Sequence, residues 1–283
     1  MSLNPTPTTE QTAPARDLLH SRYGTEQRFE PGKWTDSLDA ILSHRTVRTY
    51  LPKPVPDDIL HIAVAAAQSA PSSSNLQAWS VVAVTDLQRR AALADLATPN
   101  PQILSAPLFL LWIADLSRLR HITVNHGNSG EGLDYLESFL LASVDAALAA
   151  QNALVALESL GLGTCYIGGM RNHPAEVAAL LNLPAEAFAV FGMTVGYPDP
   201  SIKTDIKPRL PQSAVLHREQ YGETTRDAAL ADYDDTLRIF QKGQGMAVRG
   251  WSEVVAARVA DRAALKGRDL LTDIARRLGF KLR

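Results

Sequence analysis

Cations and hydroxyl side chains gather in one short segment of the chain, His44-Arg45-Thr46-Val47-Arg48. Guanidinium forks, hydroxyls and backbone N–H groups are the donors that bind a phosphate dianion, and a cation near N1 and O2 stabilises a reduced flavin ring. The segment therefore suits a phosphorylated flavin. Histidine and arginine also offset the dipole at the end of a helix, so both interpretations stay open.

Two later segments carry similar chemistry with the same ambiguity. The segment Pro71-Ser72-Ser73-Ser74-Asn75 offers hydroxyl and amide groups, but a serine-rich stretch after a helix is commonly only a turn. Lys207-Pro208-Arg209 places two cations on a rigid extended stretch that suits an anion, and it also fits an exposed basic loop. Neither segment decides the chemistry by itself.

Several common chemistries need motifs that this sequence lacks. It has no Gly-x-Gly-x-x-Gly after a strand, no Walker loop, no Gly-x-Ser-x-Gly elbow and no His-Glu-x-x-His. His121 and His126 are expected to be solvated loop residues, so no metal site is predicted. The single cysteine, Cys165, excludes an intrachain disulfide framework and fits a reducing cytoplasm. Its apolar, strand-like surroundings predict an inert buried thiol.

Composition describes an ordinary globular protein. The 283 residues are 46% hydrophobic, which is enough to build a sizeable core, and the formal net charge is −2. No polybasic run predicts a nucleic-acid or membrane partner. Residues 133–160 are the only stretch long enough to raise a membrane question, and Asp134, Glu137, Asp145 and Glu158 within it argue against a transmembrane helix.

Alternating helices and strands must position these residues. The periodicity predicts strands at 79–85, 108–113, 164–167 and 188–195, and helices at 37–43, 56–68, 87–96, 135–160, 174–181, 225–241, 251–259 and 265–278. Small residues at three- and four-residue spacing in the alanine-rich helix predict close packing in a core or a dimer interface. The class is α+β or α/β. Residues 1–34 are expected to be a disordered arm.

Taken together, these segments resemble the nitroreductase family, and most closely its oxygen-insensitive, NADPH-dependent nitroreductase and flavin reductase branch. The first segment resembles the family's His-Arg-Ser-Ile-Arg, with Thr46 replacing serine, and residues 71–79 resemble Pro-Ser-Ser-x-Asn-x-Gln-Pro-Trp, with Ala78 replacing proline. The most specific match runs through Tyr166-Ile167-Gly168-Gly169-Met170-Arg171-Asn172 to Lys207-Pro208-Arg209-Leu210-Pro211. The resemblance covers residue 38 to the C-terminus.

The resemblance implies an α+β fold in which helices flank a central mixed sheet. It also implies a long alanine-rich core helix and a helical C-terminal extension over residues 225–283, with a basic loop at 242–250. Residues 35–283 would form one FMN domain. Two such chains would make a domain-entangled homodimer with its flavin sites at the interface.

The resemblance also assigns the cofactor site residue by residue. His44, Arg45, Thr46, Lys207 and Arg209 would surround the ribityl phosphate, and Arg48 would face flavin N1 and O2. Backbone N–H groups around Gly168 and Gly169 would lie against N5 and O4 of the flavin. The partner subunit would line the ring with Pro71, Ser72, Ser73 and Asn75. Three further residues, and more weakly a fourth, complete the predicted FMN-binding set: Leu76, Tyr166 and Ile167, then Asn100.

The implied reaction is ping-pong, with hydride passing from NADPH to flavin N5 and then to a nitroaromatic or quinone. Because N5 is the reacting atom, no catalytic side chain is predicted. Lys242 and Arg249 resemble a basic loop that binds the NADPH 2′-phosphate, although flexible solvated charge explains them equally well, and Val248 stands where an arginine is common. Two alternatives are an NADPH:FMN reductase that releases reduced flavin and a flavin-binding protein without turnover.

Overall fold

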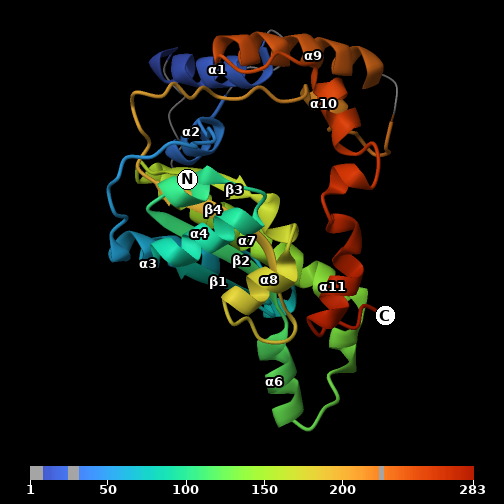
Figure 1. Ribbon diagram of the computed structural model, residues 1–283. Coiled ribbons are helices and arrows are strands. Elements are labelled where there is room, and N and C mark those ends of the chain that lie inside the picture. Colours follow the sequence, from blue (N-terminus) through green and yellow to red (C-terminus); the bar gives the residue numbers. More distant parts are fainter. Residues whose placement is uncertain (1–8, 25–31, 223–225) are drawn as a thin grey trace, which may run out of the picture. The chain divides into compact units, whose positions relative to one another are not determined.

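The computed structural model describes residues 9–24, 32–222 and 226–283 (Figure 1). The chain forms two compact units. The helical unit comprises Met1–Thr46 and Lys203–Ala264, and the sheet unit comprises Val47–Ile202 and Leu265–Arg283. The sequence predicted one domain over residues 35–283, because no change in composition marks these boundaries.

A four-stranded sheet is the centre of the sheet unit. Its strands are β1 (Trp79–Val84), β2 (Leu108–Asp115), β3 (Gly163–Ile167) and β4 (Ala187–Gly196). They lie in the order β1-β2-β4-β3, and every neighbouring pair is antiparallel. The α+β class is confirmed, but the expected mixed sheet is wrong for the strands described. Hydrophobic periodicity locates a strand without giving the direction of its neighbours, which accounts for the difference.

Helices cover both faces of this sheet (Figure 1). The even-numbered residues of β2, Leu108, Leu110 and Trp112, share one core cluster with α3 (Asp57–Gln68) and α7 (Leu136–Ser159). The odd-numbered residues of β2, 109, 111 and 113, lie in a second core cluster together with residues of three other helices. These are α4 (Leu87–Leu96), α5 (Pro101–Ser105) and α8 (Pro174–Leu180). Because β2 is buried on both faces, its sequence is a nearly continuous run of apolar residues.

Helix α7 packs its small residues against the sheet and α3. Ala146, Ala149, Ala150 and Ala153 are all fully buried, as their three- and four-residue spacing predicted. Among the residues described, α7 is the one helix long and apolar enough to cross a membrane. Its buried alanine face belongs to the core of the sheet unit, which is the ordinary position of such a helix in a folded domain.

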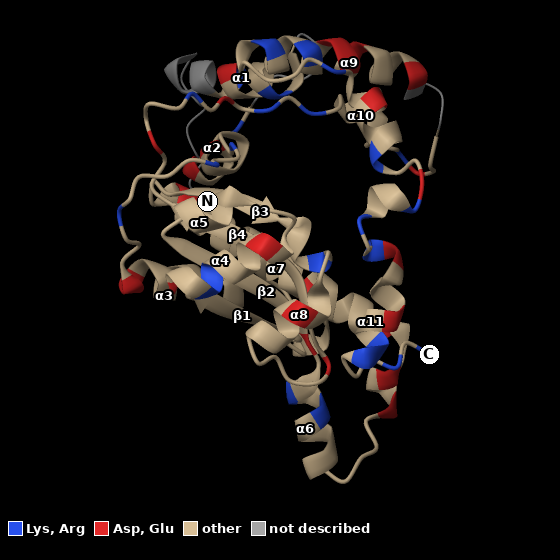
Figure 2. Ribbon diagram, in the orientation of Figure 1, with Lys and Arg blue, Asp and Glu red and all other residues tan. Residues whose placement is uncertain are grey.

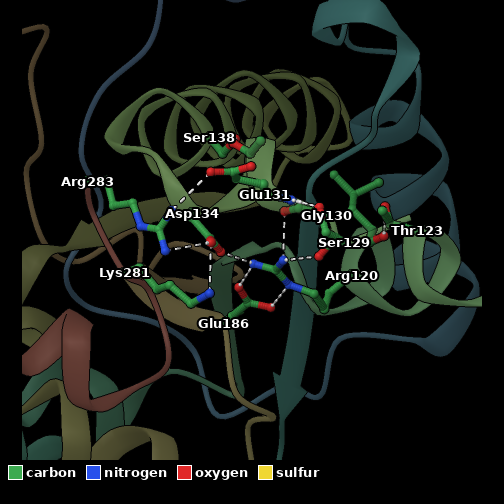
Figure 3. A network of polar contacts seen from close by, with 12 residues as sticks. Arg120, Thr123, Ser129, Gly130, Glu131, Asp134, Ser138, Glu186, Lys281 and Arg283 are labelled. Carbon is green, nitrogen blue, oxygen red and sulfur yellow. Dashed lines mark hydrogen bonds and ion pairs between the residues drawn. The ribbon is translucent and has the colours of Figure 1, made fainter. Parts of the chain in front are cut away.

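A network of polar contacts holds the C-terminal tail against the rest of the sheet unit (Figure 3). Arg120, on α6 (Ser117–Asn125), forms ion pairs with Glu186 at 2.6 Å and with the buried Asp134 at 2.7 Å. Lys281 reaches the other oxygen of Asp134 at 2.8 Å. Helix α6 contains His121, which the sequence had predicted in a loop. The tail helix α11 spans Leu271–Arg277, shorter than predicted, because residue 267 is a left-handed glycine.

The helical unit contains α1 (Thr9–Tyr23), α2 (Asp36–Leu42), α9 (Arg226–Gly243) and α10 (Trp251–Arg258). The expected disordered arm is therefore wrong for Thr9–Tyr23; residues 1–8 and 25–31 lie outside the described part. Leu19 of α1 is buried, which gives the helix a packed face. Along α9, acidic and basic side chains are mixed and do not form a face of one sign (Figure 2).

Candidate flavin site

The predicted phosphate ligands all belong to the helical unit. His44 follows the last turn of α2, and Arg45 donates from Nε to the Thr204 hydroxyl at 3.3 Å. The Lys207-Pro208-Arg209 segment is extended, and the Tyr233 hydroxyl of α9 donates to the carbonyl of Pro208 at 2.9 Å. Within this unit the structure brings both predicted segments to one arginine, Arg22.

Arg22 connects the two segments through its side chain. Its guanidinium donates to the carbonyl oxygens of Leu42 and His44 at 2.8 and 2.9 Å, and to that of Lys207 at 2.8 Å. The backbone N–H of Arg209 donates in return to the Arg22 carbonyl at 2.8 Å. His44 and Lys207, which are far apart in the sequence, therefore have carbonyl oxygens bonded to the same guanidinium.

After Thr46 the chain enters the sheet unit alongside β3. The N–H of Val47 donates to the carbonyl of Thr164 at 2.9 Å, and Val47 packs so closely on Gly163 that a Cβ there would lie 2.5 Å from its side chain. The Tyr50 hydroxyl donates to the Val47 carbonyl at 2.7 Å, and burial raises the pKa of this phenol. Arg48, between these two anchored residues, is exposed. Its backbone is fixed while its side chain is accessible.

The serine loop is shaped by a buried carboxylate of α7. Asp145, 3% exposed, accepts hydrogen bonds from the Ser72 hydroxyl at 2.7 Å and from the N–H of Ala78 at 3.0 Å. The Ser72 oxygen in turn accepts from the N–H of Gln77 at 2.8 Å. These bonds hold three non-glycine residues, Ser74, Asn75 and Gln77, at positive φ. Residues in this conformation persist where surrounding contacts over-determine the backbone.

The Gly168-Gly169 turn lies at the end of β3. It begins a 3₁₀ turn, Gly168–Arg171, and a Cβ on Gly169 would lie 2.7 Å from the carbonyl oxygen of Ala97. Arg268, in the C-terminal segment, donates to the Gly168 carbonyl at 3.0 Å and to the Asn172 side chain at 2.9 Å. The turn is therefore held from two sides, and its tight packing requires glycine at 169.

Comparison with known proteins identifies the class of this arrangement. Residues 41–197 match the nitroreductase family, and residues 207–283 match its C-terminal domain. The chain belongs to the nitroreductase family.

Similar members of the family are named for flavin and nitro chemistry. The chain is 37% identical over 227 residues to the NADPH-flavin oxidoreductase of Vibrio harveyi, covering 80% of this chain and 91% of that one. It is 36% identical over 219 residues to the oxygen-insensitive NADPH nitroreductase of Salmonella typhimurium, covering 77% and 88%. A solved structure of the NADPH:FMN oxidoreductase from Vibrio harveyi, complexed with NAD+, has a TM-score of 0.77 and 34% identity. That match covers 88% of this chain and all of the other.

Three other predicted ligands of this nitroreductase lie around the glycine turn. Tyr166 is partly exposed and packs edge-on against Phe191 with ring centroids 5.1 Å apart, while Ile167 is buried. Asn100 caps α5 by accepting from the N–H of Gln102 at 3.2 Å. Its side-chain oxygen therefore has a structural role. Cys165 donates to the Gln102 side chain at 3.4 Å and is buried, as predicted.

The predicted NADPH residues of the nitroreductase lie at the two ends of the basic loop, in the helical unit. Lys242 is in the last turn of α9. The N–H of Arg249 donates to the buried Gln241 side chain at 2.7 Å, and its guanidinium lies 4.0 Å from Glu253 in an exposed pair. Exposed pairs contribute little stability, so the Arg249 side chain is only weakly held.

Sequence reasoning missed three residues that bond the candidate segments: Asp145, Arg268 and Arg22. Asp145 carried a usable signal, because an acid on the alanine face of a core helix must find donors. Arg268 and Arg22 carried no such signal. Arg268 is a single arginine after a glycine, and Arg22 lies in the N-terminal arm, so neither belongs to a periodic pattern that indicates a contact. No group of three or more potential metal ligands occurs within the described ranges.

Proposed function

We propose that this nitroreductase is an FMN-dependent NADPH oxidoreductase that moves a hydride from NADPH to a nitroaromatic or quinone acceptor in two half-reactions. The family and the names of similar members support this class. The observation that carries the proposal is the gathering of the cationic segments at 44–46 and 207–209 around one guanidinium in the helical unit. A phosphate dianion is the ligand that such a donor set fits.

The donor chemistry suits FMN at its phosphate end. Cations come from Arg45, Lys207 and Arg209, an imidazole comes from His44, and a hydroxyl comes from Thr46, all on the two segments that Arg22 connects. We therefore assign them to the ribityl phosphate.

The ring end is assigned to Arg48, Gly168 and Gly169. Arg48 is the cation for N1 and O2, and the backbone N–H groups of Gly168 and Gly169 are the donors for N5 and O4. When bound, the flavin supplies a two-electron centre that accepts a hydride and passes it on. The protein's contribution is to orient the ring and to hold donors where negative charge develops.

We further propose a homodimer in which each subunit lines the flavin ring of the other with Pro71, Ser72, Ser73 and Asn75. Exposed apolar side chains on α7 follow a four-residue spacing, with Leu136, Leu140, Val144 and Leu148 between 40 and 57% exposed. A stripe of this kind suits a second copy of the same helix face. Val144→Lys is expected to yield monomers in light scattering, whereas Ile122→Lys, at an equally exposed position on α6, should leave dimers.

Nucleotide selectivity is assigned to Lys242 and Arg249, which would bind the 2′-phosphate of NADPH. The test is anaerobic stopped-flow reduction of the bound flavin with NADPH and NADH separately. A preference for NADPH that is lost in Lys242→Ala or Arg249→Ala, and kept in the exposed control Arg218→Ala, supports the assignment. Equal use of both nucleotides by the natural protein would contradict it. NADPH chemistry also fits our prediction of a cytoplasmic location.

A second candidate is an NADPH:FMN reductase that releases reduced flavin, favoured by the similarity to an NADPH-flavin oxidoreductase. Flavin affinity distinguishes the two. A yellow cofactor that survives gel filtration supports the nitro or quinone reductase. Colourless protein that turns over added FMN supports the flavin reductase.

A further inference from the structure

Arg22 comes from a part of the chain that precedes the family match. Helix α1 ends at Tyr23, and the match to the nitroreductase family begins at residue 41. Nevertheless Arg22 is only 5% exposed, and Leu19 and Ala15, about one and two turns earlier on α1, are buried. A buried guanidinium is retained only with several well-placed acceptors. Its position is therefore specified by the fold.

The acceptors of Arg22 belong to the two phosphate segments. The Leu42 carbonyl, in the last turn of α2, is one of the carbonyls that a helix end leaves without an intrahelical donor, and Arg22 supplies that donor at 2.8 Å. Two residues later the same nitrogen bonds the His44 carbonyl. These two bonds fix the direction of the chain as it leaves α2. The backbone that leads to Arg45 and Thr46 is therefore fixed as well.

The second segment is held by both the side chain and the main chain of Arg22. The guanidinium donates to the Lys207 carbonyl, and the Arg22 carbonyl accepts from the N–H of Arg209. Pro208, between them, is held by Tyr233 through its carbonyl. All three residues of the segment are thus fixed, and Lys207 and Arg209 start from anchored backbone.

We propose that Arg22 is a positioning residue for the phosphate end of the FMN site. It bonds the backbone of the 44–46 segment to that of the 207–209 segment, so the two backbone segments that carry the cations and the Thr46 hydroxyl are ordered before the ligand arrives. Ordering them in advance removes an entropic cost from binding. The inference rests on the proposed function, because it names the helix that builds the phosphate site of the same cofactor.

The test compares FMN with riboflavin, which lacks the phosphate. Dissociation constants are measured by quenching of flavin fluorescence for the natural protein, Arg22→Met and Arg22→Lys. Arg22→Met is expected to weaken FMN about tenfold or more and to change riboflavin by less than about twofold. Arg22→Lys should recover part of the loss, since an ammonium keeps the charge but not the planar fork. Arg16→Met, on an exposed residue of the same helix, is the matched control.

The outcomes separate this inference from the function. Equal weakening of FMN and riboflavin, or no weakening, overturns the role of Arg22 while the natural protein still binds FMN. A natural protein that binds neither flavin overturns the proposed function itself. Thermal unfolding is followed in parallel; if Arg22→Met does not fold, Arg22→Gln and Arg22→Lys carry the same comparison, with Arg22→Gln expected to lose FMN affinity selectively.

Discussion

The carboxylate of Asp145 accepts a 2.7 Å hydrogen bond from the Ser72 hydroxyl, which links the core helix α7 to the serine loop. The same oxygen accepts the N–H of Ala78. Ser72 therefore shapes the loop, and the flavin contact predicted for it from the sequence stays a prediction. The loop's positive-φ residues depend on an acid that is about seventy positions away in the chain.

Replacing this acid is expected to release the loop. Asp145→Ala leaves the N–H of Ala78 without its acceptor and should lower the free energy of unfolding by about 1–3 kcal/mol. Flavin affinity should fall as well, because the loop no longer has one conformation. Denaturant unfolding and flavin fluorescence check both effects. Glu137→Ala, an exposed acid on the same helix, should change neither, and an Asp145→Ala protein with natural flavin affinity would contradict this role.

The two glycines of the turn are expected to differ in their tolerance of a methyl group. Gly169→Ala would place Cβ 2.7 Å from the Ala97 carbonyl, whereas Gly168→Ala would meet only the end of the Arg171 side chain at 3.4 Å. Gly169→Ala should therefore displace the turn and lose most bound flavin, at a cost of about 1–3 kcal/mol in stability. Gly168→Ala should keep its flavin. Equal flavin content in the two purified variants would show that the turn is not tightly packed at 169.

Arg268 should affect the flavin through the turn that it holds. Its guanidinium bonds the Gly168 carbonyl, which shares a peptide group with the N–H of Gly169, so the bond both fixes and polarises that donor. Arg268→Met is expected to weaken flavin binding about three- to tenfold, or by about 1 kcal/mol. Arg276→Met, in an exposed pair on α11, is the control. Identical flavin affinity in both variants would remove Arg268 from the site.

Low pH should weaken the ion pairs of Asp134 that hold the C-terminal tail, and so lower the stability of the protein. Hydrogen bonds from Lys281 and Arg120 hold the pKa of Asp134 below its ordinary value of 3.8. A carboxyl with a lowered pKa in the folded state stabilises the protein above pH 3.8, and this stability is lost as the pH falls through the folded pKa. Melting temperatures between pH 5 and pH 2.5 should fall less steeply in Lys281→Met than in the natural protein. Arg277→Met should keep the natural slope; a parallel slope for Lys281→Met would contradict this explanation.

Sequence patterns predicted the parts of the fold that depend on local periodicity. Helix α4 lies at residues 87–96 as expected, and the buried alanines of α7 follow from their spacing. Strand direction was not predictable, because it depends on pairings between distant segments. Helix α6 was missed; it is only nine residues long and none of its side chains is buried.

The candidate site also has parts that local sequence patterns indicate and parts that depend on contacts between distant segments. The cationic segment at 44–48 and the glycine pair at 168–169 could be found because their residue types are distinctive at short range. Arg22, Asp145 and Arg268 bond backbone groups between 20 and 185 positions away, and no local sequence pattern indicates such contacts. The candidate ligands therefore show in short-range sequence patterns, whereas the residues that hold their backbone could be found only from the fold.

The most direct test of the account is anaerobic titration of the purified protein with NADPH, followed by absorbance of the bound flavin. The account predicts FMN as the extracted cofactor, bleaching by about one equivalent of NADPH per subunit, and recovery of the yellow colour when a quinone or nitroaromatic is added. Protein that retains no FMN and bleaches none when FMN is supplied would contradict it.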